Sequence, residues 1–270
     1  MINGIFNTTY KYNKPMPKRV VVIDDFTTKQ VYLDFDFKPD ATHGEVVSRF
    51  IEEGLPSAQI DKINIKTNNL SNIIGALEKV LSSIDSGIKY DALNMSFGNF
   101  FNIKYLAQIL DKNINEANIN KYKNDIKNWL NTANVDDNGK QIRKIIQLLD
   151  NISSHGVPIY LSAGNAGKEN FNLFSLAEKS VTVGALNKDN KTKSKFNCSL
   201  VDKWTQGCFS IRKLTDKKGH TGFDYTGDGT IDKYTTSTSS YTKWANPYGI
   251  YGSSFASPRQ LVQDLLKTRQ

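Results

Sequence analysis

KRVVVIDD, residues 18–25, is the stretch that indicates the fold. Its four consecutive β-branched residues predict a strand that is buried on both faces, as the strands of a parallel sheet are. Asp24 and Asp25 stand at the end of this strand. Ligands of open α/β sheets bind beyond the carboxyl ends of the parallel strands. The same stretch therefore predicts a buried sheet and a polar site at its edge.

Strand and helix patterns alternate along the rest of the chain. The further predicted strands are short apolar runs at residues 59–66, 91–96, 157–165 and 180–186. Helices are predicted at 43–54, ending at Gly54, and at 71–84, with Ser71 as the N-cap. Residues 103–152 contain two polar helical stretches separated by the turn-like ANVDDNGK. Strands separated by helices require right-handed crossovers, so we predict an α/β fold of three layers, a mostly parallel central sheet with helices on both faces.

Length and composition fit a single folded unit. The chain has 270 residues, of which 39% are apolar and 11% aromatic, and these can bury a substantial core. We predict one domain over residues 1–270, with a helical insertion at about 100–152 and a loop insertion at about 210–246. The helical insertion offers a surface for a partner or for reshaping a binding cleft.

Composition excludes several classes of protein. The net charge of +8 comes from scattered lysines without a nucleic-acid-binding motif, so we expect no nucleic-acid partner. No apolar run approaches the roughly 20 residues of a membrane span. The first residues carry no signal-peptide pattern, so we expect a cytoplasmic protein, with secretion by another route left open. Cys198 and Cys208 form neither a disulfide framework nor a zinc-ligand spacing.

Polar clusters follow three of the predicted strands. Asp24 and Asp25 end the first strand, residues 96–98 end the third, and residues 162–165 end the fourth. Because the carboxyl ends of parallel strands share one edge of the sheet, we expect all three clusters on one side of the molecule.

Only three histidines can serve as a general base for a serine nucleophile, which needs one within hydrogen-bond reach. His43 begins a predicted helix, where a lone histidine is more often a solvent-facing residue than a base. His155 precedes a strand at the opposite end of the sheet and reads as a helix C-terminal residue. His220 lies in the loop-like KKGHTG. His43 is therefore the best candidate.

Ser254 and Asn165 supply the remaining groups of a serine hydrolase. Ser254 lies in YGSSFASPRQLVQDLL, where Pro258 fits a first helical turn and places the hydroxyl near a helix N-terminus, which favours negative charge. An ordinary N-cap is the alternative, a role that Ser253 fills equally well. Asn165, in SAGNAG, is either a turn residue or an amide donor to an oxyanion.

Together these motifs resemble those of the subtilisin family of serine proteases, the subtilases. The matching segments, in chain order, are VVVIDD, HGEVVSRFI, NMSFG, SAGNAG, VGAL followed by KFNCSLVDKWTQGC, and GSSFASP. Each motif is weak alone, but the order Asp, His, Ser is the one found in subtilisin. The resemblance runs from Val20 to Pro258, nearly the whole chain, and implies the subtilisin-like fold.

The resemblance implies a serine endopeptidase that cuts protein or peptide substrates through an acyl-enzyme and requires no cofactor. Ser254 would attack the scissile carbonyl, His43 would carry the proton, and Asp24 would orient His43. Asn165 and the Ser254 N–H would hold the oxyanion. The implied substrate-binding residues are the peptide-pairing edge Ser96, Phe97 and Gly98, and the pocket wall Ser162, Ala163 and Gly164.

Some residues depart from the family pattern. Asp25 and Phe26 replace a usual Ser or Thr and a usual Gly, and we expect Asp25 to point away from Asp24 because strand side chains alternate. Glu45 stands in place of a common Thr, and Arg259 in place of a common His. None of these changes removes a catalytic group. They do motivate an alternative, a latent or inactive protein that binds peptides in the same cleft.

DYTGDGTID, residues 224–232, resembles part of a calcium-binding loop. Asp224, Asp228 and Asp232 would supply the carboxylates. Thr235 occupies the position of the bidentate Glu, so the loop lacks its strongest ligand, and a hairpin with a Gly-rich turn is the favoured alternative. Calcium is the one cofactor that the sequence leaves open.

Overall fold

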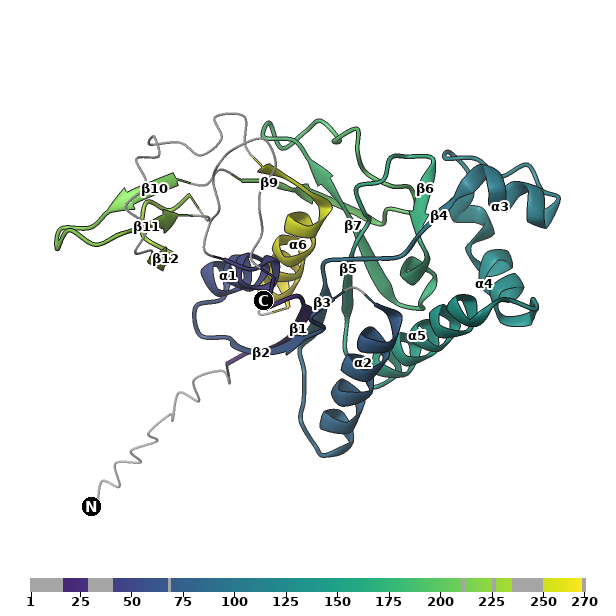
Figure 1. Ribbon diagram of the computed structural model, residues 1–270, viewed down its shortest axis with the longest axis horizontal. Coiled ribbons are helices and arrows are strands. Elements are labelled where there is room, and N and C mark those ends of the chain that lie inside the picture. The colour runs from purple at the N-terminus through teal and green to yellow at the C-terminus, as the bar shows by residue number, and fades with distance from the viewer. Residues whose placement is uncertain are drawn as a thin grey trace, which may run out of the picture.

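A six-stranded sheet forms the centre of the molecule (Figure 1). The computed structural model describes residues 17–28, 41–67, 69–209, 212–224, 227–234 and 250–268. The strands, in their order across the sheet, are β2 (Gln59–Asn64), β1 (Arg19–Asp24), β3 (Ala92–Met95), β5 (Ile159–Ser162), β7 (Ser180–Leu186) and β8 (Lys203–Gln206). All neighbouring strands pair in parallel, so their carboxyl ends lie at one edge.

Helices cover both faces of this sheet. Helices α1 (His43–Gly54) and α6 (Ser253–Lys267) pack on one face, and α2 (Leu70–Asp85) and α5 (Asp137–Ser154) pack on the other (Figure 1). The β-branched run of β1 packs against the helices on both faces, because alternate side chains point into opposite apolar clusters. The predicted three-layer α/β architecture is therefore confirmed.

The segment predicted as a helical insertion belongs largely to the main core. It contains β4 (Phe100–Asn102), α3 (Ile103–Leu110), the 3-10 helix η1 (Ile119–Tyr122), α4 (Lys123–Thr132) and then α5. Leu106 and Ile126 are fully buried in the same apolar cluster as strand β1. The two predicted helical stretches are thus three helices and a 3-10 turn. Helix α5 begins inside the predicted turn ANVDDNGK, because the Asp136 side chain caps it by accepting from the Gly139 N–H at 2.8 Å.

One helix start also differs from the sequence prediction. The N-cap of α2 is Asn69 and not Ser71, since the Asn69 side chain accepts a hydrogen bond from the Asn72 N–H. Both residue types are good caps, and the hydrogen bond from the Asn72 N–H identifies Asn69 as the cap. Ser71 lies inside the helix, where its hydroxyl accepts from the Gln141 amide.

Short strands complete the described structure. β4 pairs with β6 (Asn170–Asn172), which leads into the 3-10 helix η2 (Leu173–Leu176). β9 (Cys208–Phe209) pairs with β13 (Ile250–Tyr251). β10 (Arg212–Thr215), β11 (Thr221–Asp224) and β12 (Lys233–Tyr234) form an antiparallel sheet. Of the predicted loop insertion at 210–246, residues 210–211, 225–226 and 235–246 lie outside the described residues. Within the described ranges, no helix has the length and apolarity needed to cross a membrane.

Candidate active site

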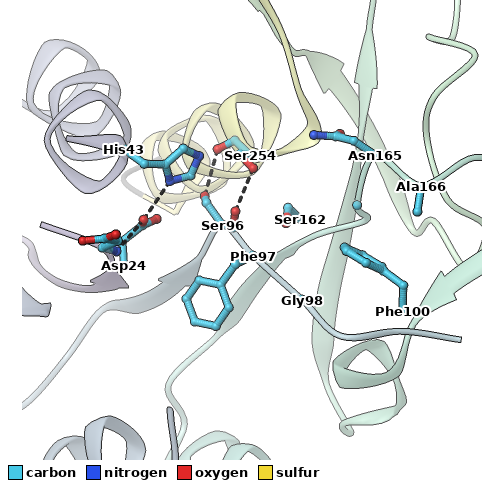
Figure 2. Close-up of a pocket in the computed structure, with 12 residues that line it drawn as sticks. Asp24, His43, Ser96, Phe97, Gly98, Phe100, Ser162, Asn165, Ala166 and Ser254 are labelled. Carbon is cyan, nitrogen blue, oxygen red and sulfur yellow. Dashed lines mark hydrogen bonds and ion pairs between the residues drawn. The ribbon is translucent and has the colours of Figure 1, made fainter. Parts of the chain in front are cut away.

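A cleft of about 480 Å³ opens at the carboxyl ends of β1, β3 and β5. The structure brings the three polar clusters that follow these strands together in it, along with residues of α1 and α6 (Figure 2). The lining residues are Asp24, Asp25, His43, Ser96, Phe97, Gly98, Phe100, Ser162, Gly164, Asn165, Ala166 and Ser254. Among the residues predicted from sequence for this site, Ala163 is buried and does not line the cleft.

Asp24 and His43 form a close polar pair in the cleft. His43 Nδ1 lies 2.7 Å from Asp24 Oδ1, and the Asp24 carboxyl is almost fully buried at the end of β1. The other oxygen, Oδ2, is buried without a hydrogen-bond partner in the part of the chain that the structure describes. A buried carboxylate so placed fixes the orientation of the imidazole and stabilises its protonated form.

Local sequence fixes His43 at the start of helix α1. Thr42 is the N-cap, and its side chain accepts from the Glu45 N–H at 3.2 Å. The Glu45 carboxylate accepts in return from the Thr42 N–H at 2.8 Å, which completes a capping box. Glu45, a departure from the family pattern, thus holds the backbone from which His43 projects.

The loop after β1 packs directly on the same helix turn. A methyl group on Gly44 would lie 2.7 Å from the Phe26 ring, so any side chain at this position would have to displace the ring. The Gly44 N–H also donates to the Asp25 carbonyl at 2.9 Å. These two contacts connect the loop after β1 to the start of α1, the segments next to Asp24 and His43.

Asp25 faces the cleft, contrary to the prediction that it points away. Strand alternation fails here because β1 ends at Asp24 and the chain turns. The Asp25 carboxylate accepts from the N–H groups of Thr27 at 2.7 Å and Thr28 at 2.9 Å. Burial raises the pKa of Asp25, but these hydrogen bonds and the nearby His43 outweigh it and hold the pKa below its usual value. Asp25 is therefore a second anion beside the histidine.

His43 carries a raised pKa. Burial alone lowers the pKa of the imidazole, but the charge of Asp24, the hydrogen bond to Asp24 and the charge of Asp25 together outweigh burial. The neutral form that can accept a proton therefore predominates only at a higher pH than it does for an ordinary histidine.

Ser254 lies in the first turn of α6, on the far side of the His43 ring from Asp24 (Figure 2). Its N–H is one of the first four of the helix, which have no intrahelical acceptor and can face an anion. The Ser254 hydroxyl donates to the Ser96 carbonyl at 2.7 Å. Because a hydroxyl has one proton to donate, it is not donated to His43 in this state.

Helix α6 begins at Ser253, about one turn earlier than Pro258 predicts, and Pro258 lies inside it. Proline has no N–H, so it cannot donate to the carbonyl of Ser254 four residues before it. The Ser96 hydroxyl donates to this carbonyl at 2.8 Å instead. Asn94 donates to Ser96 Oγ at 3.0 Å and accepts from Ser257 at 2.9 Å, so a buried network supports the start of the helix.

Asn165 is held by Ser253. Its Oδ1 accepts from both the N–H and the hydroxyl of Ser253, each at 3.0 Å. The Ser253 hydroxyl in turn accepts from the Gly164 N–H at 2.9 Å. Since these bonds occupy the amide oxygen, the amide nitrogen is the end of Asn165 that can donate to a ligand beside Ser254. Ser253, for which the sequence suggested an N-cap role, is instead the residue that orients Asn165.

The other histidines and the predicted calcium loop lie apart from this chemistry. His155 is the C-cap of α5, and His220 Nδ1 lies 3.0 Å from Asp216 in the turn between β10 and β11. β11 and β12 form the hairpin that was the alternative to a calcium loop. Asp232 pairs with Arg49 at 2.6 Å. Among the described residues, no three His, Cys, Asp or Glu side chains are grouped to hold a metal, and calcium binding there stays a prediction.

Comparison with known proteins gives a result only at the level of structure. No protein-family model matches the sequence, and no curated protein matches it. A lanthipeptide protease is 14% identical with a TM-score of 0.50, and the match covers 91% of this chain and 71% of that one. The self-cleaved protease domain of PatA is 13% identical with a TM-score of 0.50, covering 94% and 83%. A psychrophilic protease is 14% identical with a TM-score of 0.50, covering 92% and 75%.

These neighbours are subtilisin-like protease domains, and at such low identities the likeness concerns the fold alone. The parallel sheet with helices on both faces matches theirs. This chain therefore has the subtilisin-like fold that its sequence motifs predict.

Proposed function

We propose that this protein is a serine endopeptidase in which Asp24, His43 and Ser254 form the catalytic triad. The observation that carries the proposal is the 2.7 Å contact between Asp24 and His43 in the same cleft as Ser254, at the edge of the sheet where α/β proteins bind ligands. The protease fold of the neighbours supports the same reaction class.

The proposed reaction uses each group in turn. The Ser254 oxygen forms a bond to the substrate carbonyl carbon while His43 takes the hydroxyl proton, and the carbonyl electrons move to the oxygen. Asn165 Nδ2 and the Ser254 N–H donate to that oxyanion. The C–N bond then breaks as His43 gives its proton to the leaving amine. Water repeats the sequence on the acyl-enzyme and releases the new carboxyl end and the Ser254 hydroxyl.

Substrate binding completes the site in this mechanism. The Ser96 carbonyl, which now accepts from Ser254, lies on the edge that would pair with an extended peptide. A peptide N–H that donates to this carbonyl takes the place of the hydroxyl. Rotation of the Ser254 side chain then turns its proton toward His43.

The second candidate function is a latent or inactive peptide-binding protein with the same cleft. The observation that favours it is the hydrogen bond from Ser254 to Ser96, which directs the nucleophile's proton away from the base. In this reading a bound peptide occupies the cleft and is not cut.

Cleavage of a peptide library, read by mass spectrometry, separates the two functions. The proposed enzyme cuts peptides internally, and Ser254→Ala abolishes every cut while it still binds the same peptides. A wild-type protein that binds library peptides with no products above those of Ser254→Ala would refute the endopeptidase and establish the binding protein.

A further inference from the structure

The cleft contains an aromatic ring that the triad does not use. Gly164 has a φ of +100°, and a methyl group added there would lie 2.0 Å from Phe100 Cε1. The ring of Phe100 therefore rests directly against the backbone of the wall formed by residues 162–164. Figure 2 shows this ring directed back into the cleft, toward Gly98 on the opposite wall. Phe100 is 41% exposed, so its outer face remains open to a ligand.

A buried amide closes the space behind the opposite wall. A methyl group on Gly98 would lie 2.3 Å from Asn172 Nδ2. Asn172 is fully buried, donates to the Ser162 carbonyl at 2.9 Å, and accepts from the Asn99 N–H at 3.2 Å. The Asn172 side chain thus links the segment of Gly98 to that of Ser162 and fills the space between them at that depth.

The backbone beneath the ring is fixed by pairing. Phe100 lies directly opposite Asn172 in the antiparallel ladder of β4 and β6. The Ile103 N–H continues the contact by donating to the Glu169 carbonyl at 2.9 Å. Phe100 is thus presented from a strand and not from a free loop, so its ring cannot leave the cleft by a backbone shift without breaking this ladder.

We propose that Phe100 is the residue that determines specificity, by restricting the side chain that precedes the cleaved bond to Gly, Ala or Ser. This inference rests on the proposed function, which places that side chain between residues 96–98 and 162–164. A larger side chain entering there meets the Phe100 ring on one side and Asn172 behind. Substrates with a small residue before the cleaved bond avoid steric contact with both side chains.

Phosphonate probes test this inference without any protein substrate. Two diphenyl aminoalkylphosphonates are compared, one with a methyl and one with a benzyl side chain before the reactive phosphorus, and adducts are followed by intact mass. The wild type is expected to react about 10- to 100-fold faster with the methyl probe, a ratio typical of steric discrimination in a pocket. Phe100→Ala, with Phe100→Val as a variant that keeps a good strand former, should lose or reverse this ratio.

Tyr105→Ala is the matched control, because it removes an exposed aromatic ring of α3 that does not line the cleft, and its probe ratio should equal that of the wild type. A fluorophosphonate without a side chain tests the proposed function separately. If Ser254 reacts with the fluorophosphonate but the wild type prefers the benzyl probe, the specificity inference is overturned and the proposed function is kept. The same conclusion follows if both Phe100 variants keep the wild-type ratio. If no form of the folded protein reacts with any probe, both are overturned.

Discussion

Ser96→Ala is expected to destabilise the protein at the start of helix α6, which carries Ser254. The change removes a hydroxyl that donates to the Ser254 carbonyl at 2.8 Å and accepts from the Asn94 amide at 3.0 Å. Pro258 has no N–H to donate to that carbonyl, so the Ser254 carbonyl loses the donor that takes the place of the helical one. An unpaired buried polar group costs about 1–3 kcal/mol, and two such groups, one of them only partly buried, give an expected loss of about 2–4 kcal/mol.

The Pro258→Ala substitution tests whether the cost of Ser96→Ala comes from the missing helical hydrogen bond. Alanine restores an N–H four residues after Ser254, in position to donate to the same carbonyl. In the Pro258→Ala background, Ser96→Ala should therefore cost about 1–2 kcal/mol less than it does in the wild type. The remaining cost belongs to Asn94, whose amide loses its acceptor in both backgrounds.

Urea unfolding, followed by far-UV circular dichroism, measures all four proteins of this cycle. Comparison of free energies requires that their m-values agree. Ser86→Ala is the control, because the Ser86 hydroxyl makes a similar bond to a helix carbonyl, that of Ser82, on the surface, where its loss should cost less than about 0.5 kcal/mol. An equal cost of Ser96→Ala in both backgrounds would refute the claim that Ser96 replaces the missing helical bond.

Two further predictions concern catalysis. The rate of Ser254 labelling should rise with pH, with a midpoint above the ordinary histidine pKa of about 6.5, because Asp24 and Asp25 raise the pKa of His43 and only its neutral form accepts the proton. Asp25→Asn keeps an oxygen for the loop hydrogen bonds but removes a charge, so the midpoint should move down; an unchanged or higher midpoint in the labelling profile would contradict this. Asn165→Ala should lower peptide turnover by about 100- to 1000-fold with little change in KM, a magnitude measured for the equivalent loss in subtilisin itself. A change confined to KM would show that Asn165 binds the ground state and not the oxyanion.

The parts of the fold that sequence predicted are those encoded locally. The β-branched run before Asp24 could only be a buried strand, and β1 covers residues Arg19–Asp24. Helix α1 begins and ends where its pattern predicted, since Thr42 and Glu45 supply a complete capping box. The parallel arrangement then followed from the alternation of strands and helices, without any long-range contact being known.

The parts that sequence could not predict depend on contacts between distant residues. Asp25 turns into the cleft because Phe26 packs on Gly44 and the chain turns back on itself. The orientation of the Ser254 hydroxyl depends on the Ser96 carbonyl, which is far away in the sequence. Strand alternation and helix signals contain no information about such pairs.

The position of Phe100 in the candidate substrate pocket could not be predicted from the sequence either. Its position in the sequence, just after the predicted peptide-binding edge, assigned it to the start of an insertion. Only the pairing of β4 with β6, together with the positive φ of Gly164, places the ring in the cleft. An aromatic residue two positions beyond Gly98 is the one sequence signal that could have drawn attention to it.

The proposed function depends on activation of Ser254 by His43, and covalent labelling with a fluorophosphonate measures this activation most directly. Wild type, Ser254→Ala and His43→Ala are compared by intact mass and peptide mapping, with His155→Ala as a control because His155 lies at the exposed C-terminus of α5. One adduct on Ser254 is expected in the wild type and in His155→Ala, and none in the other two variants. No adduct on folded wild-type protein, or an equal adduct on His43→Ala, would contradict it.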